Sequence, residues 1–312
     1  MQKNLSLNKG DIIKLTIDDL AYGGDRVGHY QGIAVFVDRG VPGETIRAKI
    51  YKTKKNYCKA ETLEILDLSA QRVEPQCNIY RDCGGCQLQE ISYNYQLKLK
   101  KGIVQDAIER IGEMKNIRVN DVIEMDYPWY YRNKAQFPLI KNKSGKITAG
   151  FYKRGTHEVV PLNNCKIQHQ LINRIAEKTL KVLNKNQDKL SIYKEEEHKG
   201  LLRHLIIRVG VCTNQATLTL VTNGSKIPEI LNMADELLEQ IPELIGIIQN
   251  INTRKTNVIM GDKTKLIRGK KRYREYIGDI KYDIPPGSFF HPTTFHTQPL
   301  YNQPSHSLSF PP

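Results

Sequence analysis

The sequence is poor in cysteine and has no long hydrophobic run, and each shortage excludes a class of protein. Six cysteines in 312 residues are too few and too unevenly placed for the disulfide framework of a small secreted domain. No stretch approaches the roughly 20 apolar residues that a membrane-spanning helix needs. The opening MQKNLSLNKGD lacks the apolar core of a signal peptide. We therefore expect a cytoplasmic protein that does not contact a membrane.

Acidic residues are also under-represented, since 33 Asp and Glu stand against 47 Lys and Arg, a net charge of +14. A surface of this kind favours polyanions, although charge alone leaves a basic but non-specific surface open. The charge is clustered, however. Residues 254–274 hold nine basic residues and one acid, and residues 47–59 hold basic residues with Tyr51 and Tyr57 among them. Cations for phosphates and aromatic rings for bases together indicate RNA binding. The basic residues of the segment 47–59 are Arg47, Lys49, Lys52, Lys54, Lys55 and Lys59.

The chain is long enough for two or three domains, and its patterns change along its length. From residue 9 to about 66, short alternating runs separated by glycine turns predict a small β-barrel. Helical spacing of apolar residues predicts a helix over 91–111 and others over 168–185 and 227–240. Residues 129–162 predict strands with a turn at Ser144-Gly145, and residues 201–222 predict a hairpin about Thr213-Asn214.

Three cysteines lie within ten residues, in the pattern Cys77-x5-Cys83-x2-Cys86. Gly84 and Gly85 let this segment curl around a centre, and Cys165 is the natural fourth ligand. Four thiolates suit either a [4Fe–4S] cluster or tetrahedral zinc. Zinc ribbons use two close pairs, so the division into three and one favours iron–sulfur, while zinc and unrelated thiols stay open.

With these residues placed, the chain resembles the 23S rRNA (uracil-C5)-methyltransferases that carry an N-terminal TRAM domain and a four-cysteine [4Fe–4S] cluster. The matching segments run in order over residues 1 to about 290. They are AYGGDRVG, VPGETIRAKI, CNIYRDCGGCQLQ, YRNKAQFPL, GFYKRGTHEVVPLNNCKIQ and RHLIIRVG.

The resemblance implies a mixed α/β multidomain fold. It consists of a TRAM (OB-like) β-barrel at 1–66 that binds RNA, and an α+β central domain at 67–287 that holds the cluster. Helix 91–111 is expected to pack on the catalytic domain of the family. The resemblance also implies that the cysteines ligate the cluster and that ribosomal RNA is the partner of a monomer. The RNA-binding residues it implies, together with the barrel lysines, are Lys49, Lys52, Lys54, Lys55, Arg132, Lys134 and Gln136.

The chain departs from the family after SFF at 288–290, where the family has a Gln that touches the cofactor and this chain has His291. We expect residues 288–312 to be the truncated start of an otherwise missing C-terminal Rossmann-like methyltransferase domain. On this reading the chain has no catalytic residue and no intact cofactor-binding residue. It is then inactive and does not bind the S-adenosyl-L-methionine that the full-length family uses.

The resulting prediction is the RNA-binding portion of an S-adenosylmethionine-dependent enzyme that forms 5-methyluridine in 23S rRNA. The alternative is a non-catalytic protein that binds structured RNA and carries a structural iron–sulfur or zinc site.

Overall fold

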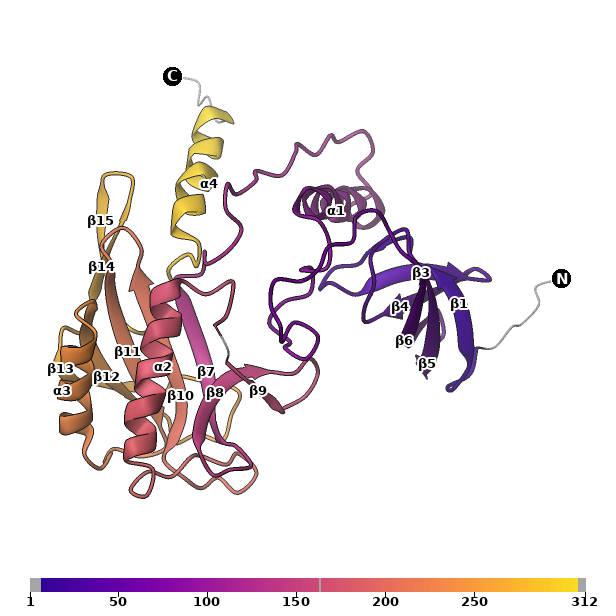
Figure 1. Ribbon diagram of the computed structural model, residues 1–312. Helices are drawn as coiled ribbons and strands as arrows, with labels where there is room; N and C mark the ends of the chain where they lie inside the picture. Colours follow the sequence, from indigo (N-terminus) through magenta and orange to yellow (C-terminus); the bar gives the residue numbers. More distant parts are fainter. Residues whose placement is uncertain (1–6, 163, 308–312) are drawn as a thin grey trace. The chain divides into compact units, whose positions relative to one another are not determined.

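The computed structural model describes residues 7–162 and 164–307, and the chain divides into two compact units (Figure 1). Unit 1 comprises Met1–Tyr80 and Cys86–Glu124, and unit 2 comprises Arg81–Gly85 and Met125–Pro312. Within the described ranges, no helix is both long enough and apolar enough to cross a membrane.

Unit 1 is built on a six-stranded sheet with the order β1-β5-β6-β4-β3-β2. All neighbouring strands are antiparallel except β4 and β6, which run parallel. The strands are β1 (Ile12–Thr16), β2 (Asp19–Leu20), β3 (Arg26–Tyr30), β4 (Ile33–Val37), β5 (Thr45–Thr53) and β6 (Tyr57–Asp67).

Alternation of side chains gives this sheet a buried inner face. Ile13 pairs with Ala48 and Leu15 with Ile46, and all four side chains are buried in one core. The sheet curls so that β3 comes close to β1. A Cβ atom on Gly28 would lie 2.2 Å from the carbonyl oxygen of Thr16, so only glycine fits where the two strands meet. The predicted barrel region is therefore a curled sheet around a core of its own.

The predicted helix 91–111 is present as α1 (Tyr93–Asp106), which continues as one π-helical turn, η1 (Ala107–Ile111). Leu99 is its buried residue, and it packs with Leu20, Val41 and Ile91 of the same unit. At the other end, 83% of Ile111 is exposed. The apolar contacts of this helix with unit 1 thus extend from Tyr95 to Ile103, and the end of the helix at Ile111 does not take part in them.

Unit 2 contains a seven-stranded sheet of order β13-β12-β11-β10-β7-β8-β9 and a separate hairpin of β14 and β15. β11 and β12 are parallel and joined through α3, and the other neighbours are antiparallel. The strands are β7 (Lys134–Lys141), β8 (Ile147–Tyr152), β9 (Val159–Pro161), β10 (Leu202–Gly210), β11 (Gln215–Thr222), β12 (Leu244–Ile251), β13 (Lys263–Gly269), β14 (Tyr273–Ile277) and β15 (Ile280–Ile284).

Two helices, α2 (Gln170–Lys185) and α3 (Ile230–Gln240), lie side by side on one face of this sheet (Figure 1). α2 begins where the His169 side chain accepts a hydrogen bond from the Leu171 backbone at 3.3 Å. The buried residues of both helices pack against Phe137 of β7 and against the inward residues of β10 and β11. The predicted helices and both predicted hairpins of this region are thus confirmed, with Asn214 in the left-handed conformation of a tight turn.

The last helix, α4 (Thr294–Ser307), belongs to unit 2 together with the segment that leads into it. Buried Asn133, just before β7, holds that segment. Its side-chain amide donates to the His291 carbonyl at 2.8 Å and to the Thr294 hydroxyl at 2.9 Å. Its backbone N–H donates to the carbonyl of Pro292 at 2.9 Å. The start of α4 is therefore built onto the sheet of unit 2.

Candidate nucleic-acid interface

The basic segment of unit 1 lies on β5 and on the turn that follows it. Lys49 and Lys52 are exposed on β5, and Lys54 and Lys55 are exposed in the turn before β6. Lys49 faces Glu61 across the strands, which screens part of its charge. Among the described residues, the other three lysines form no ion pair with a carboxylate. The end of the β5-β6 hairpin therefore presents uncompensated positive charge, as RNA phosphates require.

The three residues expected to lie near RNA at 132–136 are partly exposed and alternate along the chain. Lys134 and Gln136 of β7 pair with Arg208 and Ile206 of β10, so they project from the face opposite the helices. Burial and the neighbouring charge of Arg208 both lower the pKa of Lys134. Arg132 precedes the strand and bridges to Gln168 and Thr293. Lys134 and Gln136 thus share one face of β7, beside Arg208, a cation that sequence reasoning missed.

The four cysteines are divided between the two units, and each is partly buried. In unit 2, Cys83 forms an antiparallel bridge with Lys153, and the backbone N–H of Gly85 donates to its sulfur at 3.4 Å. A Cβ atom on Gly84 would lie 2.6 Å from the Tyr152 carbonyl, so this glycine is required for the close approach. The backbone of Cys165 is held by Asn173, which accepts from its N–H at 3.2 Å and donates to its carbonyl at 3.0 Å.

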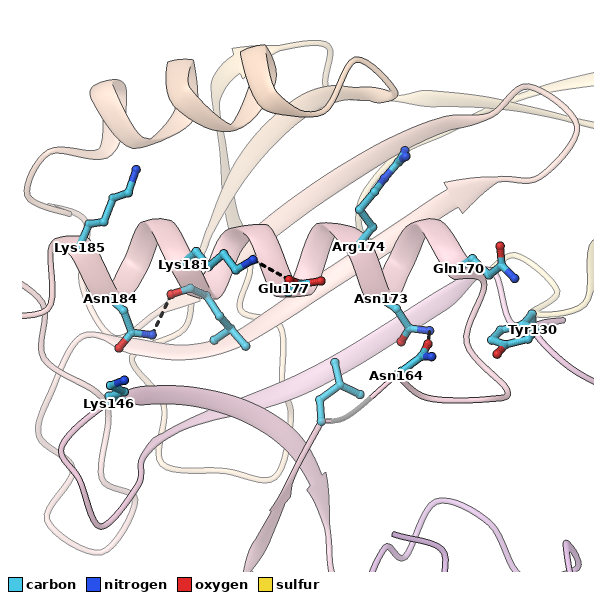
Figure 2. Close-up of a pocket in the computed structure, with 12 residues that line it drawn as sticks. Tyr130, Lys146, Asn164, Gln170, Asn173, Arg174, Glu177, Lys181, Asn184 and Lys185 are labelled. Carbon is cyan, nitrogen blue, oxygen red and sulfur yellow. Dashed lines mark hydrogen bonds and ion pairs between the residues drawn. The ribbon is translucent and has the colours of Figure 1, made fainter. Parts of the chain in front are cut away.

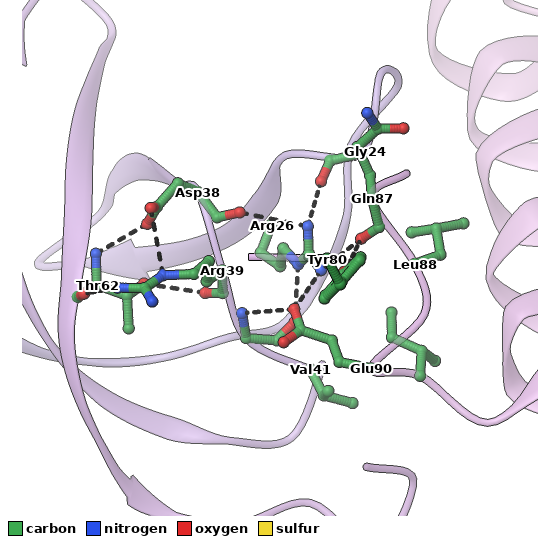
Figure 3. A network of polar contacts seen from close by, with 12 residues as sticks. Gly24, Arg26, Asp38, Arg39, Val41, Thr62, Tyr80, Gln87, Leu88 and Glu90 are labelled. Carbon is green, nitrogen blue, oxygen red and sulfur yellow. Dashed lines mark hydrogen bonds and ion pairs between the residues drawn. The ribbon is translucent and has the colours of Figure 1, made fainter. Parts of the chain in front are cut away.

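In unit 1, Cys77 and Cys86 lie in a segment that is tied to the barrel. Figure 3 shows Arg26 between the Gln87 carbonyl, which it reaches at 2.8 Å, and the Glu90 carboxylate. The Tyr80 hydroxyl donates to the same Gln87 carbonyl at 2.7 Å. Gln89 accepts from the Cys77 N–H at 3.2 Å. Hydrogen bonds to the Cys77 N–H, and to the carbonyl of Gln87 next to Cys86, therefore fix the backbone of both cysteines.

In the part of the chain that the structure describes, no group of three or more His, Cys, Asp or Glu side chains is arranged to hold a metal ion. The donor chemistry nevertheless fits an iron–sulfur centre, because four partly buried thiols are available and a backbone N–H points at one sulfur. The ligand assignment of Cys77, Cys83, Cys86 and Cys165 remains a prediction. Of the two remaining cysteines, Cys58 is a barrel core residue and Cys212 lies in the exposed turn after β10.

A groove of about 1100 Å³ runs along α2 in unit 2 (Figure 2). Its cations are mostly neutralised. Lys181 pairs with Glu177 at 2.6 Å, Arg174 pairs with Glu243 at 2.6 Å, and Lys185 pairs with Glu236. Asn184, Asn164 and Asn173 are occupied by contacts within the groove or with backbone. This groove is consequently a weaker candidate for a polyanion than the end of the β5-β6 hairpin.

Comparison with known proteins identifies the domain type of the curled sheet in unit 1. Residues 7–63 match the TRAM domain. The match covers β1 to β5 and most of β6, the six strands of the curled sheet. The prediction of a TRAM barrel at the start of the chain is thereby confirmed at the level of the domain type.

Relatives extend the similarity over nearly all of the chain. An uncharacterized RNA methyltransferase of Halalkalibacterium halodurans is 38% identical over 299 residues, which is 95% of this chain and 64% of that protein. One from Clostridium tetani is 38% identical over 97% of this chain and 65% of that protein, and one from Listeria monocytogenes is 39% identical over 95% and 64%. The chain therefore spans a little under two thirds of the length of the curated relatives it matches.

Among solved structures, the chain is similar to Pyrococcus abyssi tRNA (uracil-54, C5)-methyltransferase, determined in complex with S-adenosyl-L-homocysteine. The TM-score is 0.70 at 24% identity, and the match covers 95% of this chain and 65% of that one. At this identity the likeness establishes the fold.

The expected fold class, with a missing C-terminal Rossmann-like domain, is contradicted. The solved methyltransferase aligns with this chain as a mixed α/β fold over 95% of its length. The physical reason is that the side chain of Asn133 holds the segment from His291 into α4, so this segment is part of unit 2. The predicted truncation and inactivity are likewise not supported.

Proposed function

We propose that the protein is an S-adenosylmethionine-dependent RNA (uracil-C5)-methyltransferase of 23S ribosomal RNA, and that the described residues hold the RNA. The observation that carries the proposal is the TRAM domain at residues 7–63 in a chain whose relatives, over 95% of its length, are named RNA methyltransferases. The resemblance of the cysteine segment and of YRNKAQFPL to the ribosomal RNA enzymes favours ribosomal RNA as the substrate. The basic end of the β5-β6 hairpin and the Lys134 side of β7 are the RNA-holding surfaces of this proposal.

The reaction sets requirements that the protein must meet. C5 of uracil becomes nucleophilic when a thiolate adds to C6 and produces an enolate. The enolate takes the methyl group from S-adenosylmethionine, a base then removes the C5 proton, and the thiolate leaves. The target base must first leave its stack.

We further propose that Cys77, Cys83, Cys86 and Cys165 ligate a [4Fe–4S] cluster with a structural role. Thiolates are the ligands of such clusters, and a hydrogen bond such as that from the Gly85 N–H to the Cys83 sulfur is typical of their surroundings. When bound, the cluster would tie the segment 77–86 to the segment around Cys165. Thiol ligands of this kind suit a reducing, cytoplasmic compartment.

For the domain organisation we propose a TRAM barrel at 1–66 and a cluster-bearing region at 67–287.

Tritium release tests the activity. RNA transcribed with tritium at C5 of every uridine loses one tritium to water for each methyl group that enters at C5. The protein, purified anaerobically and mixed with S-adenosylmethionine, is expected to release tritium from a 23S rRNA transcript and not from a tRNA transcript. Release from tRNA alone would contradict the ribosomal substrate.

The alternative is a protein that binds structured RNA without modifying it, and the same samples decide between the two. Tight RNA binding by filter retention, with no tritium release from 23S rRNA or tRNA, would reject the methyltransferase and favour the binder.

A further inference from the structure

A second cavity of unit 2, of about 1220 Å³, has a different character from the groove along α2. It lies where the end of β7, the end of β8 and the start of β10 meet two loops, 191–197 and 255–259. Aromatic and cationic side chains line it together with aliphatic ones. We call it the Tyr152 pocket.

The aromatic walls of this pocket leave ring surface available. Tyr152 is 40% exposed and meets His157 edge to face, with the ring centroids 5.8 Å apart. On another wall, the guanidinium of Arg203 lies over the ring of Tyr193 at 4.2 Å. Two backbone carbonyls, of Asn252 and Arg254, each accept from Arg203 at 2.8 Å and hold it in place. The guanidinium is consequently fixed in place, and it gives the wall formed by Tyr193 a positive charge.

Two buried nitrogens among the residues that line the pocket have no hydrogen-bond partner within the described ranges, Arg203 Nε and His204 Nδ1. Buried polar atoms are nearly always paired, so two neighbouring exceptions in the lining of one cavity need an explanation. Burial, together with the charge of Arg203, lowers the pKa of His204 to about 4. At neutral pH its imidazole is therefore uncharged and can either donate or accept a hydrogen bond.

The rim of the pocket combines cations and carboxylates. Lys194 pairs with Glu197 at 3.0 Å, and the Lys255 ammonium donates to the backbone carbonyl of Glu196 at 3.1 Å. The Glu195 carboxylate lies 4.0 Å from Nδ1 of His157, the ring that meets Tyr152 edge to face. Burial raises the pKa of the Tyr152 phenol, and the charge of Glu195 raises it further. Lysines at a rim suit a phosphate, and a carboxylate beside an exposed ring suits an exocyclic amine of a base.

We infer that the Tyr152 pocket binds an unstacked nucleotide of single-stranded RNA whose base carries an exocyclic amine. This inference rests on the proposed function and adds a binding position to it. The base stacks on Tyr152, its amine donates to Glu195, and Lys255 lies close to its phosphate. Uracil has no exocyclic amine, so the pocket holds a nucleotide other than the one that is methylated.

Fluorescence anisotropy with fluorescein-labelled rC6, rA6 and rU6 tests the inference on the complete chain. We expect the wild-type protein to bind rC6 and rA6 more tightly than rU6. Tyr152→Ala should weaken binding of rC6 and rA6 by about 5- to 100-fold, the loss usual for a stacked base. Tyr152→Phe keeps the ring and should bind as wild type, and so should Tyr301→Ala, which removes a tyrosine that is 64% exposed on α4.

A second variant covers the case in which truncation of Tyr152 disturbs the fold. Lys255→Ala changes only an exposed side chain, and it should weaken all three hexamers by about 2- to 5-fold. Hexamer binding that is unchanged in both Tyr152→Ala and Lys255→Ala, or a wild-type preference for rU6, would overturn the inference.

The tritium-release assay on the same proteins keeps this outcome separate from the proposed function. If the wild-type protein releases tritium and the variants bind the hexamers as tightly as the wild type, the inference about the Tyr152 pocket is rejected and the methyltransferase proposal stands. If hexamer binding depends on Tyr152 and no tritium is released, the inference about the Tyr152 pocket is supported and the methyltransferase proposal is rejected.

Discussion

The guanidinium of Arg26 meets the carboxylate of Glu90 at 2.5 Å, with side chains that are 1% and 9% exposed. Arg72 reaches the same carboxylate at 3.2 Å and also pairs with Glu44 at 2.5 Å. The Arg26–Glu90 pair, which Figure 3 shows, joins β3 of the TRAM barrel to the segment that follows Cys86. The order of the cysteine segment in unit 1 therefore depends on the barrel, in addition to any metal.

Replacing Arg26 should destabilise unit 1 strongly. Arg26→Met keeps most of the volume but leaves Glu90 buried with Arg72 as its remaining partner. We expect a loss of about 3 kcal/mol in the free energy of unfolding, in line with breaking a buried pair from one side. Hydrogen exchange of β3 and β4 amides in the complete chain measures it.

Lys59→Met is the matched control, because Lys59 meets Asp25 at 3.4 Å in a more exposed pair. It should cost less than about 1 kcal/mol. Equal losses in the two variants would show that burial does not set the strength of the Arg26 pair.

The stability of unit 2 should fall as the pH drops from about 6.5 to about 4. Burial and Arg203 lower the pKa of His204 to about 4, below the value of about 6.5 in an unfolded chain. Between these two values the unfolded state binds the proton and the folded state does not, so acid favours unfolding. Because the ring of His204 is partly exposed, we expect the free energy of unfolding of unit 2 to fall by roughly 2 kcal/mol across this pH range.

Urea unfolding followed by the fluorescence of Trp129, the single tryptophan, reports on unit 2 at each pH. His204→Gln should reduce the slope of stability against pH in this window. Some slope should remain, because burial also lowers the pKa of His169. A slope that is the same in His204→Gln and wild type would contradict the assignment.

Removal of a cysteine ligand should remove the metal. Protein purified anaerobically is expected to be brown and to contain about four irons per chain, as a [4Fe–4S] cluster requires. Cys86→Ser should lose the visible absorption, lower the thermal midpoint and weaken RNA binding together. Cys212→Ser removes an exposed cysteine in a turn and should retain the iron. Colourless wild-type protein that contains zinc would reject the cluster, and iron retained in Cys86→Ser would reject Cys86 as a ligand.

Features set by neighbouring residues could be predicted from the sequence, and features set by distant partners could not. The β10-β11 hairpin about Asn214 and helix α2 follow from local turn chemistry and apolar spacing. Arg26 and Glu90 are 64 residues apart, and Asn133 and Thr294 are 161 apart. Neither pair leaves a periodic signal. The one indication in the sequence is Arg26 itself, because an arginine at an inward position of a strand needs a buried partner of opposite charge.

The same limit explains the error about the C-terminal segment. Its composition and the replacement of an expected Gln by His291 suggested a domain cut short. The backbone carbonyl of His291, which its side chain does not determine, is the group that accepts from Asn133. A substitution that looks disruptive in a motif can therefore leave the local packing intact.

Positive charge at the end of the β5-β6 hairpin should set the salt dependence of RNA binding. The triple variant K52A/K54A/K55A removes three exposed cations that have no carboxylate partner within the described ranges. Each phosphate contact on single-stranded RNA contributes about 0.7 to the slope of log K against log salt concentration. The variant should therefore have a slope lower by about 2 and should bind more weakly at low salt.

A triple variant of equal charge in unit 2, K263A/K265A/K271A, is the control, and it also tests the other basic segment, residues 254–274, that charge alone indicated for RNA. Lys263 and Lys265 lie on β13, the edge strand of the sheet, where lysines prevent pairing with other chains, a role that needs no RNA. This control should therefore leave the slope nearly unchanged. If it lowers the slope as much as K52A/K54A/K55A, the basic charge acts as a diffuse surface and the barrel has no special part in holding RNA.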